Sequence, residues 1–180
     1  MRYKRAKIRG GTYFFTVVTR LRKPFLCVPE NRDLLRESFK QVMTFRPFRI
    51  EAFVLLPDHL HCIWTLPDGD RDFSTRWRLI KTHFTKNCDQ QLRTQPDKSR
   101  ERGKEQSVWQ HRYWEHLIRD QNDFNRHVEY IHYNPVKHGY VGSPFDWEYS
   151  SFKKFVILGI YAETWGAKME DRDDWGDIEE

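Results

Sequence analysis

The stretch FRIEAFVLLPDHLHCIWTLP, residues 48–67, decides the fold class, because it holds two apolar segments on either side of a short turn. Both segments are rich in β-branched and aromatic residues, which favour strands. Pro57 and Asp58 between them are typical turn residues. Two strands joined by so short a connection pair in opposite directions. We therefore expect an antiparallel hairpin here.

Other strands and helices are expected on both sides of this hairpin. Residues 10–20, GGTYFFTVVTR, form a dense β-branched and aromatic run after two glycines, which predicts a strand. Residues 29–45 place apolar side chains at helical spacing, which predicts an amphipathic helix. The later patterns predict a helix at 73–92, a strand at 108–120, a helix at 122–135 ended by Pro135, and a short helix with a docking segment at 146–165.

This order of elements predicts an α+β sandwich, with helices packed on an antiparallel-type sheet. A chain of 180 residues with 38% apolar and 32% charged residues suits one globular domain. We expect that domain at 1–165, with a basic arm at 1–10 and a mobile charged loop at 93–107 that has no large apolar residue. An acidic tail at 166–180 follows.

The charge of the chain is unevenly distributed. Residues 169–180 carry seven acidic residues and one basic residue, so a chain of net charge +5 has a body of +11. Eight Lys and Arg residues precede the first acid, Glu30. Such a basic body with many aromatics favours nucleic acid over other polyanions, although a basic arm taken alone is also typical of a solvated, flexible segment.

The three cysteines are widely spaced and form no CxxC pair, which disfavours disulfide scaffolds and zinc ribbons. The chain has no apolar run of signal-peptide or membrane length. We expect a cytoplasmic protein with reduced thiols and no membrane partner.

His59 and His61 form the first candidate site. Side chains alternate between the two faces of a strand, so these two imidazoles share one face while Leu60, Cys62 and Trp64 occupy the other. They could offer two nitrogens to one metal ion, but a third ligand would have to come from elsewhere. The spacing fits equally well with histidines that pack against a helix or lie at a wet edge.

Tyr130 and Asn134 form the second candidate site, within the segment YIHYNPVKHG at 130–139. In a helix these two residues are one turn apart and face the same way. Pro135 disfavours helical geometry at Asn134, so we expect that amide at the helix end. An ordinary core tyrosine and an ordinary helix stop remain alternatives.

Together the two sites suggest a chemistry. Two neutral imidazoles and an amide oxygen could hold Mg²⁺ or Mn²⁺ and leave positions open for a phosphate oxygen. The ion would polarise that phosphate, and a tyrosine beside it could attack phosphorus. A free phenol, with a pKa of about 10, is a weak nucleophile, so the metal and nearby bases would have to favour the phenolate.

The histidine pair preceded by LPD, together with YIHYNPVKHG, resembles the HUH single-tyrosine transposases, in particular the REP-associated tyrosine transposases. The resemblance extends over most of residues 10–165. It includes, in order, the segments GGTYFFTVVT, AFVLLPDHLHCIWTLPDGD, FSTRWRLIKTHFTK, VWQHRYWEH and DWEYSSF.

This resemblance implies a ferredoxin-like core whose central strand carries the metal histidines. It implies His59, His61 and Asn134 as metal ligands and Tyr130 as the nucleophile. The implied reaction is transesterification on single-stranded DNA, which gives a 5′-phosphotyrosine and a free 3′-hydroxyl. The implied substrates are imperfect palindromes folded as hairpins, bound by a monomer or a dimer that swaps the tyrosine helix, without a small-molecule cofactor.

A single strand or hairpin needs cations for its phosphates and flat side chains for its bases. The candidate DNA contacts are Arg2, Arg5, Arg9, Arg76, Arg78, Lys81, Trp109, Arg112, Lys137 and His138. Two other functions remain open at this point: a non-catalytic protein that binds hairpin nucleic acid, and a metal hydrolase that uses water.

Overall fold

The computed structural model of the protein describes residues 8–93 and 108–167. The arm predicted at 1–10, the loop predicted at 93–107 and the tail predicted at 166–180 therefore fall almost wholly outside the described residues. Arg2 and Arg5 also lie outside them.

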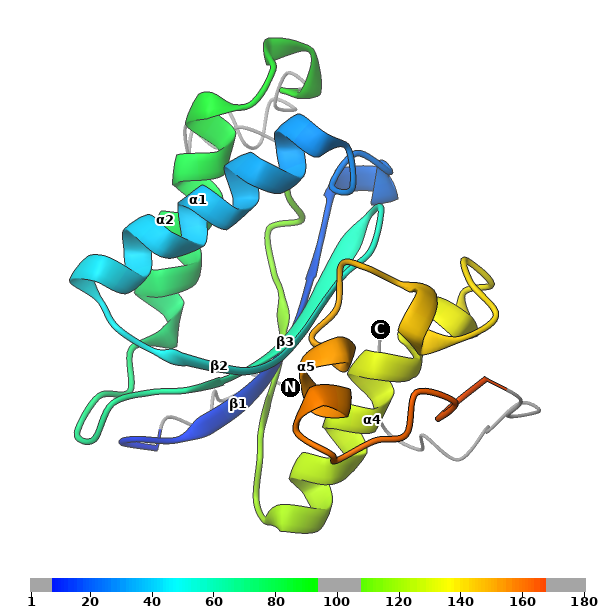
Figure 1. The fold of residues 1–180 in the computed structure, drawn as a ribbon. Coiled ribbons are helices and arrows are strands. Elements are labelled where there is room, and N and C mark those ends of the chain that lie inside the picture. The colour runs from blue at the N-terminus through cyan, green and yellow to red at the C-terminus, as the bar shows by residue number, and fades with distance from the viewer. Residues whose placement is uncertain (1–7, 94–107, 168–180) are drawn as a thin grey trace, which may run out of the picture.

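A four-stranded antiparallel sheet forms the centre of the described chain (Figure 1). The two central strands, β1 (Thr12–Val18) and β3 (His59–Thr65), pair with each other; β2 (Arg49–Leu55) pairs with β3 at one edge, and β4 (Trp114–Leu117) pairs with β1 at the other. The predicted hairpin is confirmed as β2 and β3. The sheet order is β2-β3-β1-β4.

Helices cover both faces of this sheet (Figure 1). Two long helices, α1 and α2, pack side by side on one face, and α4 with the short α5 covers the other. The order β1-α1-β2-β3-α2-β4 with this sheet order is ferredoxin-like, so the predicted α+β class is confirmed. The helices are α1 (Pro29–Phe45), α2 (Phe73–Asn87), α4 (Gln121–Lys137) and α5 (Phe152–Ile157), with short 3₁₀ turns η1 (Arg20–Arg22), η2 (Gln90–Leu92) and η3 (Pro144–Asp146).

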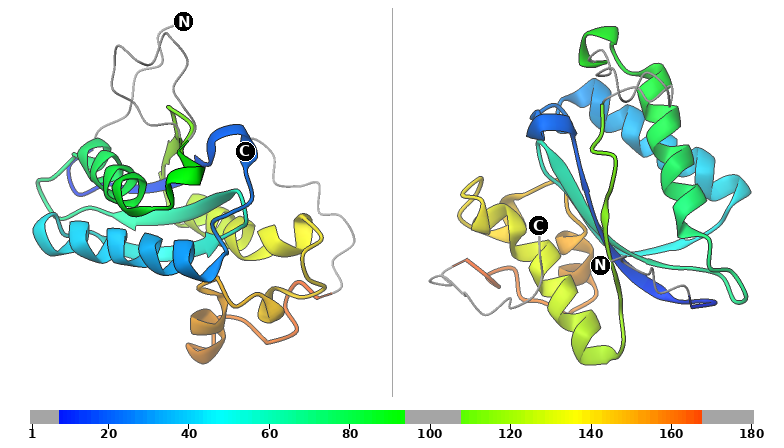
Figure 2. Two further views of the ribbon diagram at one scale, coloured as in Figure 1. Left: turned by 90° about the horizontal axis from the view of Figure 1, so that it is seen from above. Right: turned by 180° about the vertical axis from the view of Figure 1, so that it is seen from behind.

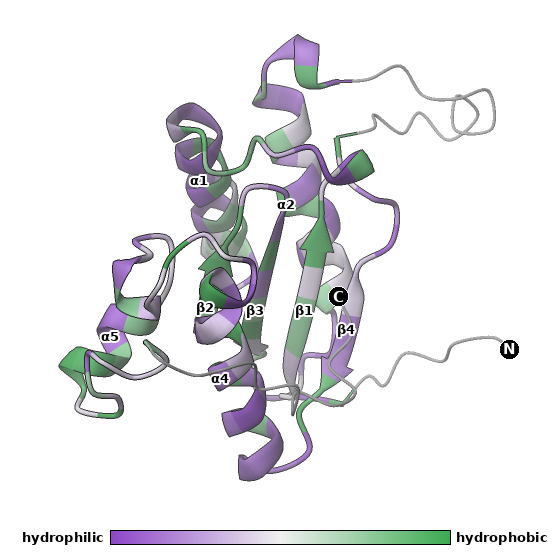
Figure 3. Ribbon diagram, turned by 90° about the vertical axis from the view of Figure 1, so that its right-hand side faces the viewer, coloured by the Kyte–Doolittle hydropathy of each residue, from purple (hydrophilic) through white to green (hydrophobic). Residues whose placement is uncertain are grey.

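The alternation of side chains along the strands divides the core in two. Phe15 and Trp64 point to the face covered by α1 and α2, whereas Phe14 and Ile63 point to the face covered by α4. In Figure 3 the strands β1, β2 and β3 are mainly hydrophobic, whereas the long helices carry many of the hydrophilic residues. A sheet covered on both faces needs apolar residues at nearly every strand position, so the buried histidines of β3 are exceptions.

Some predicted boundaries are wrong. The helix predicted at 73–92 ends at Asn87 and is followed by η2, and the strand predicted at 108–120 is regular only over β4. The segment before β4 still follows the end of β1, because the amide of Gln110 donates to the carbonyl of Val18.

Pro135 does not end its helix, contrary to the prediction. α4 continues to Lys137, and the amide of His138 still donates to the carbonyl of Asn134 over 3.0 Å. A proline so near the last residue removes one hydrogen bond and leaves the last turn in place. Asn134 therefore lies inside the helix, where its side-chain direction is fixed. Among the described residues, no helix is both long enough and apolar enough to cross a membrane.

Candidate active site

The two histidines of β3 point to the face of the sheet that α4 covers. His59 is 1% exposed and His61 is 0% exposed. Their rings meet edge to face with centroids 4.9 Å apart. The prediction that they share one face, opposite Leu60, Cys62 and Trp64, is confirmed.

Each of these histidines has a partner at Nδ1. His59 Nδ1 lies 2.6 Å from Oδ1 of Asp58, and His61 Nδ1 lies 2.9 Å from the hydroxyl of Thr16, which stands opposite it on β1. A carboxylate accepts from an N–H and a hydroxyl can do so. Asp58 therefore favours the tautomer of His59 in which Nε2 carries the lone pair, and the contact with Thr16 is compatible with the same tautomer of His61.

The pKa shifts of Asp58 and His61 agree with this arrangement of hydrogen bonds. Burial alone would raise the pKa of Asp58, but its hydrogen bonds and charge interactions with His59 and Arg22 outweigh burial and hold the pKa below its ordinary value. The Arg22 guanidinium lies 3.2 Å from Asp58 Oδ2. Burial, with a smaller contribution from His59, lowers the pKa of His61 well below its ordinary value, so this imidazole is neutral near pH 7.

α4 places Tyr130 and Asn134 against the same face of the sheet. The Tyr130 ring packs edge to face on His61, with centroids 5.2 Å apart, and on Phe14, at 6.0 Å. The ammonium of Lys137 lies over the Tyr130 ring, 5.1 Å from its centroid. The structure thus brings the predicted tyrosine and one predicted metal histidine into contact.

Several buried polar atoms here have no hydrogen-bond partner among the described residues. They are Nε2 of His59, Nε2 of His61, and both Oδ1 and Nδ2 of Asn134. A buried polar atom left unpaired costs about 1–3 kcal/mol, so two unpaired Nε2 atoms on neighbouring rings, with an unpaired amide on the covering helix, indicate a ligand site. Two imidazole nitrogens and an amide oxygen suit a divalent ion, and histidines held at the other nitrogen are typical of metal ligands.

The predicted DNA contacts differ in whether DNA could reach them. Arg78, Arg112 and Lys137 are exposed, as is Arg9, while Lys81 and His138 are partly exposed. The His138 ring lies 5.2 Å from that of His59, at the candidate site.

Two of the predicted DNA contacts are buried in the structure. Arg76 is 1% exposed, and its guanidinium donates to the Asp70 carboxylate and to three backbone carbonyls. Trp109 is buried and packs its ring edge to face on Phe84. Both side chains hold the α1 and α2 layer together, so neither offers a surface to DNA.

Sequence reasoning missed Asp58, Thr16 and Arg22, which orient the two histidines directly or through one neighbour. Asp58 could have been found, because a carboxylate directly before a candidate ligand is a natural partner for its second nitrogen. Thr16 could not, since only the register of β1 on β3 places it opposite His61.

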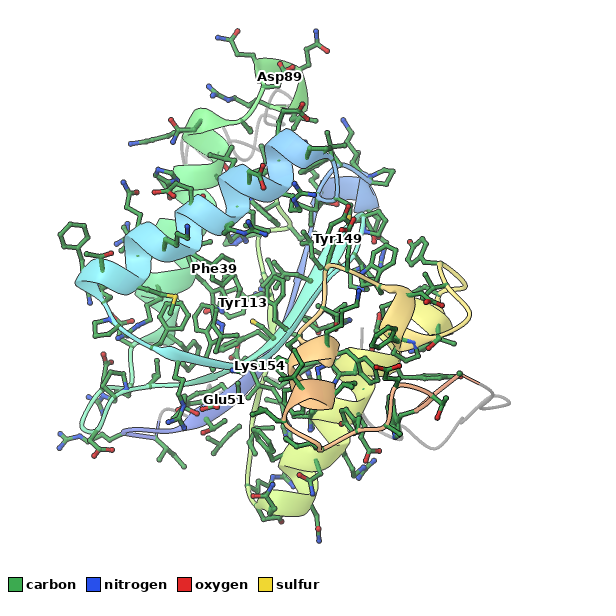
Figure 4. The ribbon with its side chains drawn as sticks, in the orientation of Figure 1. Phe39, Glu51, Asp89, Tyr113, Tyr149 and Lys154 are labelled. Carbon is green, nitrogen blue, oxygen red and sulfur yellow. The ribbon has the colours of Figure 1, made fainter. Side chains whose placement is uncertain are left out.

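A pocket of about 400 Å³ lies elsewhere, between α1, β2 and the segment before α5. Figure 4 labels two of its lining residues, Phe39 on α1 and Tyr149 near the ends of β2 and β3. None of the four candidate site residues lines it, and its walls are mainly apolar. The residues that line this pocket therefore give no support to chemistry there.

Comparison with known proteins gave several similarities. No family model matches the chain. The REP-associated tyrosine transposase of Escherichia coli strain K12 is 44% identical over 169 residues, which cover 94% of this chain and 93% of that protein. A relative from Haemophilus influenzae is also 44% identical over 169 residues. A solved structure of a REP-associated tyrosine transposase bound to a REP hairpin is 41% identical, with a TM-score of 0.77 over 96% of this chain and 95% of that chain.

Proposed function

Because this chain belongs to the family of REP-associated tyrosine transposases, we propose that it cleaves and rejoins single-stranded DNA at hairpin elements of the REP type, with Tyr130 as the nucleophile. The observation that carries this proposal is the group of unpaired polar atoms on His59, His61 and Asn134, on the sheet face against which Tyr130 packs. The solved relative bound to a REP hairpin supports the choice of substrate.

In the proposed step the Tyr130 oxygen attacks phosphorus and loses its proton. The bond between phosphorus and the 3′-oxygen breaks, and the departing oxygen takes up a proton to become a free 3′-hydroxyl. The strand on the other side stays attached to Tyr130 through its 5′-phosphate. A phosphodiester replaces a phosphodiester, so the reverse reaction rejoins strands without another energy source.

His59, His61 and Asn134 would hold a divalent metal, Mg²⁺ or Mn²⁺. When bound, such an ion polarises the scissile phosphate and offsets the negative charge that develops there. Asp58 and Thr16 keep both imidazoles oriented with Nε2 available. This preorganisation of ligands is the part of the chemistry that the fold supplies.

The neighbours of Tyr130 position and activate it. Contacts with His61 and Phe14 fix the ring, so the oxygen has a defined direction. The Lys137 ammonium over the ring stabilises negative charge on the phenolate. Tyr130 is 1% exposed, so the side chains around it must shift to admit a phosphate.

We also propose the remaining exposed cations, Arg9, Arg78, Arg112 and Lys137, together with Lys81 and His138, as contacts to the DNA. The tyrosine and both histidines belong to one chain and lie together in it. A single chain can thus carry the whole site, which is compatible with the monomer that we propose.

The test is a covalent-adduct assay with the full chain. Hairpin DNA labelled at its 3′ end is incubated with the protein and Mg²⁺ or Mn²⁺, and adducts are separated under denaturing conditions. We expect a labelled adduct that disappears in Tyr130→Phe and persists in Tyr133→Phe, a matched buried tyrosine on the same helix. Mass spectrometry of the adduct should map the nucleotide to Tyr130.

Other outcomes would refute the proposal. Hairpin binding without any cleavage, across a range of REP-type hairpins, would indicate a non-catalytic binding protein. Cleavage without an adduct, undiminished in Tyr130→Phe, would indicate hydrolysis by water.

A further inference from the structure

A second group of metal-ligating side chains lies where β4 leads into α4. His116 is in β4, and Asp123 and His127 are in the first turns of α4, which follows β4 after a short connection (Figure 2). Their ligand atoms all lie within 4.8 Å of one another. Among the described residues they are the one group of three His, Cys, Asp or Glu side chains that meets this spacing.

This group is separate from the candidate active site. The Phe14 ring stands between them, with its centroid 4.8 Å from that of His127 and 5.6 Å from that of His61. An ion held by His116, Asp123 and His127 would thus have an aromatic ring between it and the catalytic histidines. The two groups nevertheless share α4, since Tyr130 follows His127 by three residues.

The Asp123 carboxylate is fixed between the two rings. Its Oδ2 lies 2.8 Å from His116 Nε2, and its Oδ1 lies 3.1 Å from His127 Nδ1. The backbone amide of Arg119 donates to Oδ2 over 2.9 Å, and the Asp120 side chain caps the helix at the Asp123 amide. The carboxylate therefore faces both rings, while His127 Nδ1 also lies 2.8 Å from the backbone carbonyl oxygen of Asp123.

We propose that His116, Asp123 and His127 form a second metal site, which binds a borderline divalent transition ion such as Zn²⁺, Co²⁺ or Ni²⁺. Two imidazoles and one carboxylate are a ligand set that these ions prefer and that Mg²⁺ does not. The ion would replace the proton that His116 Nε2 shares with the carboxylate, and His127 Nδ1 would give up its proton and its hydrogen bond to the Asp123 backbone carbonyl, so binding releases protons. Water would complete the coordination.

The proposed site requires one local adjustment. The ring planes of the two histidines are 16° apart with centroids at 4.6 Å, and a shared ion must lie close to both planes. His116 is at the edge of the sheet with 23% of its side chain exposed, so it has room to turn about its Cβ–Cγ bond. His127 is buried and stays in place. The ion would then tie the edge strand to the helix that carries Tyr130.

The experiment uses metal-free full chain with His59→Ala and His61→Ala, which removes the proposed catalytic ligands. Zn²⁺ is titrated in by calorimetry, and Co²⁺ by visible absorption. In each titration we expect one ion to bind per chain. Bound Co²⁺ should show the visible absorption band of a site with imidazole ligands. His116→Gln in this background should weaken binding by more than about 100-fold, since even the loss of a second-shell partner costs about 10- to 100-fold.

His111→Gln, at an exposed histidine, is the matched control and should bind the ion as before. Because the background substitutions could disturb folding, the same comparison is made in the otherwise unchanged chain, where His116→Gln should lower the Zn²⁺ stoichiometry by one. Binding that is the same in His116→Gln and His111→Gln would overturn the proposal, as would a folded background that binds no ion. Either result would leave a purely hydrogen-bonded cluster. The adduct assay with Mg²⁺ is independent of this outcome.

Discussion

The Nδ1 atom of His59 lies 2.6 Å from Oδ1 of Asp58, the residue directly before it in the chain. The turn between β2 and β3 thus supplies the group that orients a candidate ligand at the start of β3. The same carboxylate receives Arg22 at its other oxygen, so the loop after β1 is tied to the candidate active site.

Asp58→Asn should weaken the binding of Mn²⁺ at the proposed catalytic site by about 10- to 100-fold. The asparagine keeps the size of the side chain but loses the charge that orients His59 and makes it a better ligand. Mn²⁺ affinity can be measured by electron paramagnetic resonance of free Mn²⁺. Asp68→Asn, at an exposed carboxyl, is the control. Equal affinities in the two variants would show that Asp58 has no part in metal binding.

Lys137→Met should slow adduct formation by on the order of 10-fold at pH 7, because the ammonium over the Tyr130 ring no longer stabilises the phenolate. The deficit should shrink as the pH rises, since hydroxide then removes the phenolic proton. Lys137→Arg should restore most of the rate. Single-turnover rates against pH provide the measurement, and a deficit that is constant over the whole pH range would argue for a role in DNA binding alone.

Arg76→Met should lower the free energy of unfolding by about 3 kcal/mol, because it removes a buried charge and leaves several carbonyls and Asp70 without their donor. The exposed Arg78→Met should change it by less than about 0.5 kcal/mol and should instead weaken hairpin binding. Urea denaturation and a binding titration on both variants make the comparison. If the Arg76 variant keeps its stability and binds hairpins weakly, Arg76 is a DNA contact.

The free energy of unfolding should decrease as the pH is lowered, because of His132. Burial lowers the pKa of this side chain to about 3, whereas in the unfolded chain it is about 6.5. Above pH 6.5 both states are neutral at this position. Between pH 6.5 and 3 the unfolded chain binds a proton that the folded chain excludes, so stability is lost at about 1.4 kcal/mol per pH unit, or about 2 kcal/mol by pH 5.

His132→Gln cannot titrate but keeps a polar group near Ser151, whose hydroxyl lies 2.8 Å from His132 Nε2. Its unfolding free energy, measured by denaturation from pH 7 to 5, should depend less steeply on pH than that of the unchanged protein. His111→Gln, at an exposed position, should keep the original slope. Identical slopes in all three proteins would rule out His132 as the source.

Leu21→Gly should raise the free energy of unfolding by about 1 kcal/mol. Leu21 has φ +56° and Arg22 has φ +50°, a left-handed conformation that costs an L-residue about 1–2 kcal/mol and glycine very little. The Leu21 side chain is 75% exposed, so little packing is lost. Leu158→Gly, at an exposed leucine with φ −78°, relieves no strain and should not stabilise. A destabilised Leu21→Gly would mean that the side chain, not the backbone, governs this turn.

The elements of the fold follow from local patterns in the sequence. The apolar run at 48–67 predicted β2 and β3, and the helical spacing at 29–45 predicted α1, since each pattern reports the period of one element. The same periods predicted that His59 and His61 share a face and that Tyr130 and Asn134 are one turn apart. The continuation of α4 beyond Pro135 was not predicted. The packing of a whole helix outweighs the low helix propensity of one residue near its end.

The relationships between elements were decided only in three dimensions. The register of β1 on β3 placed Thr16 opposite His61, and the packing of α4 on the sheet brought Tyr130 to the same ring. Arg76 has the charge of a DNA contact, yet its position under α1 made it a core residue. A side chain's period along its own element is set by backbone geometry, whereas its neighbours and its exposure depend on how distant elements pack, which no local pattern encodes.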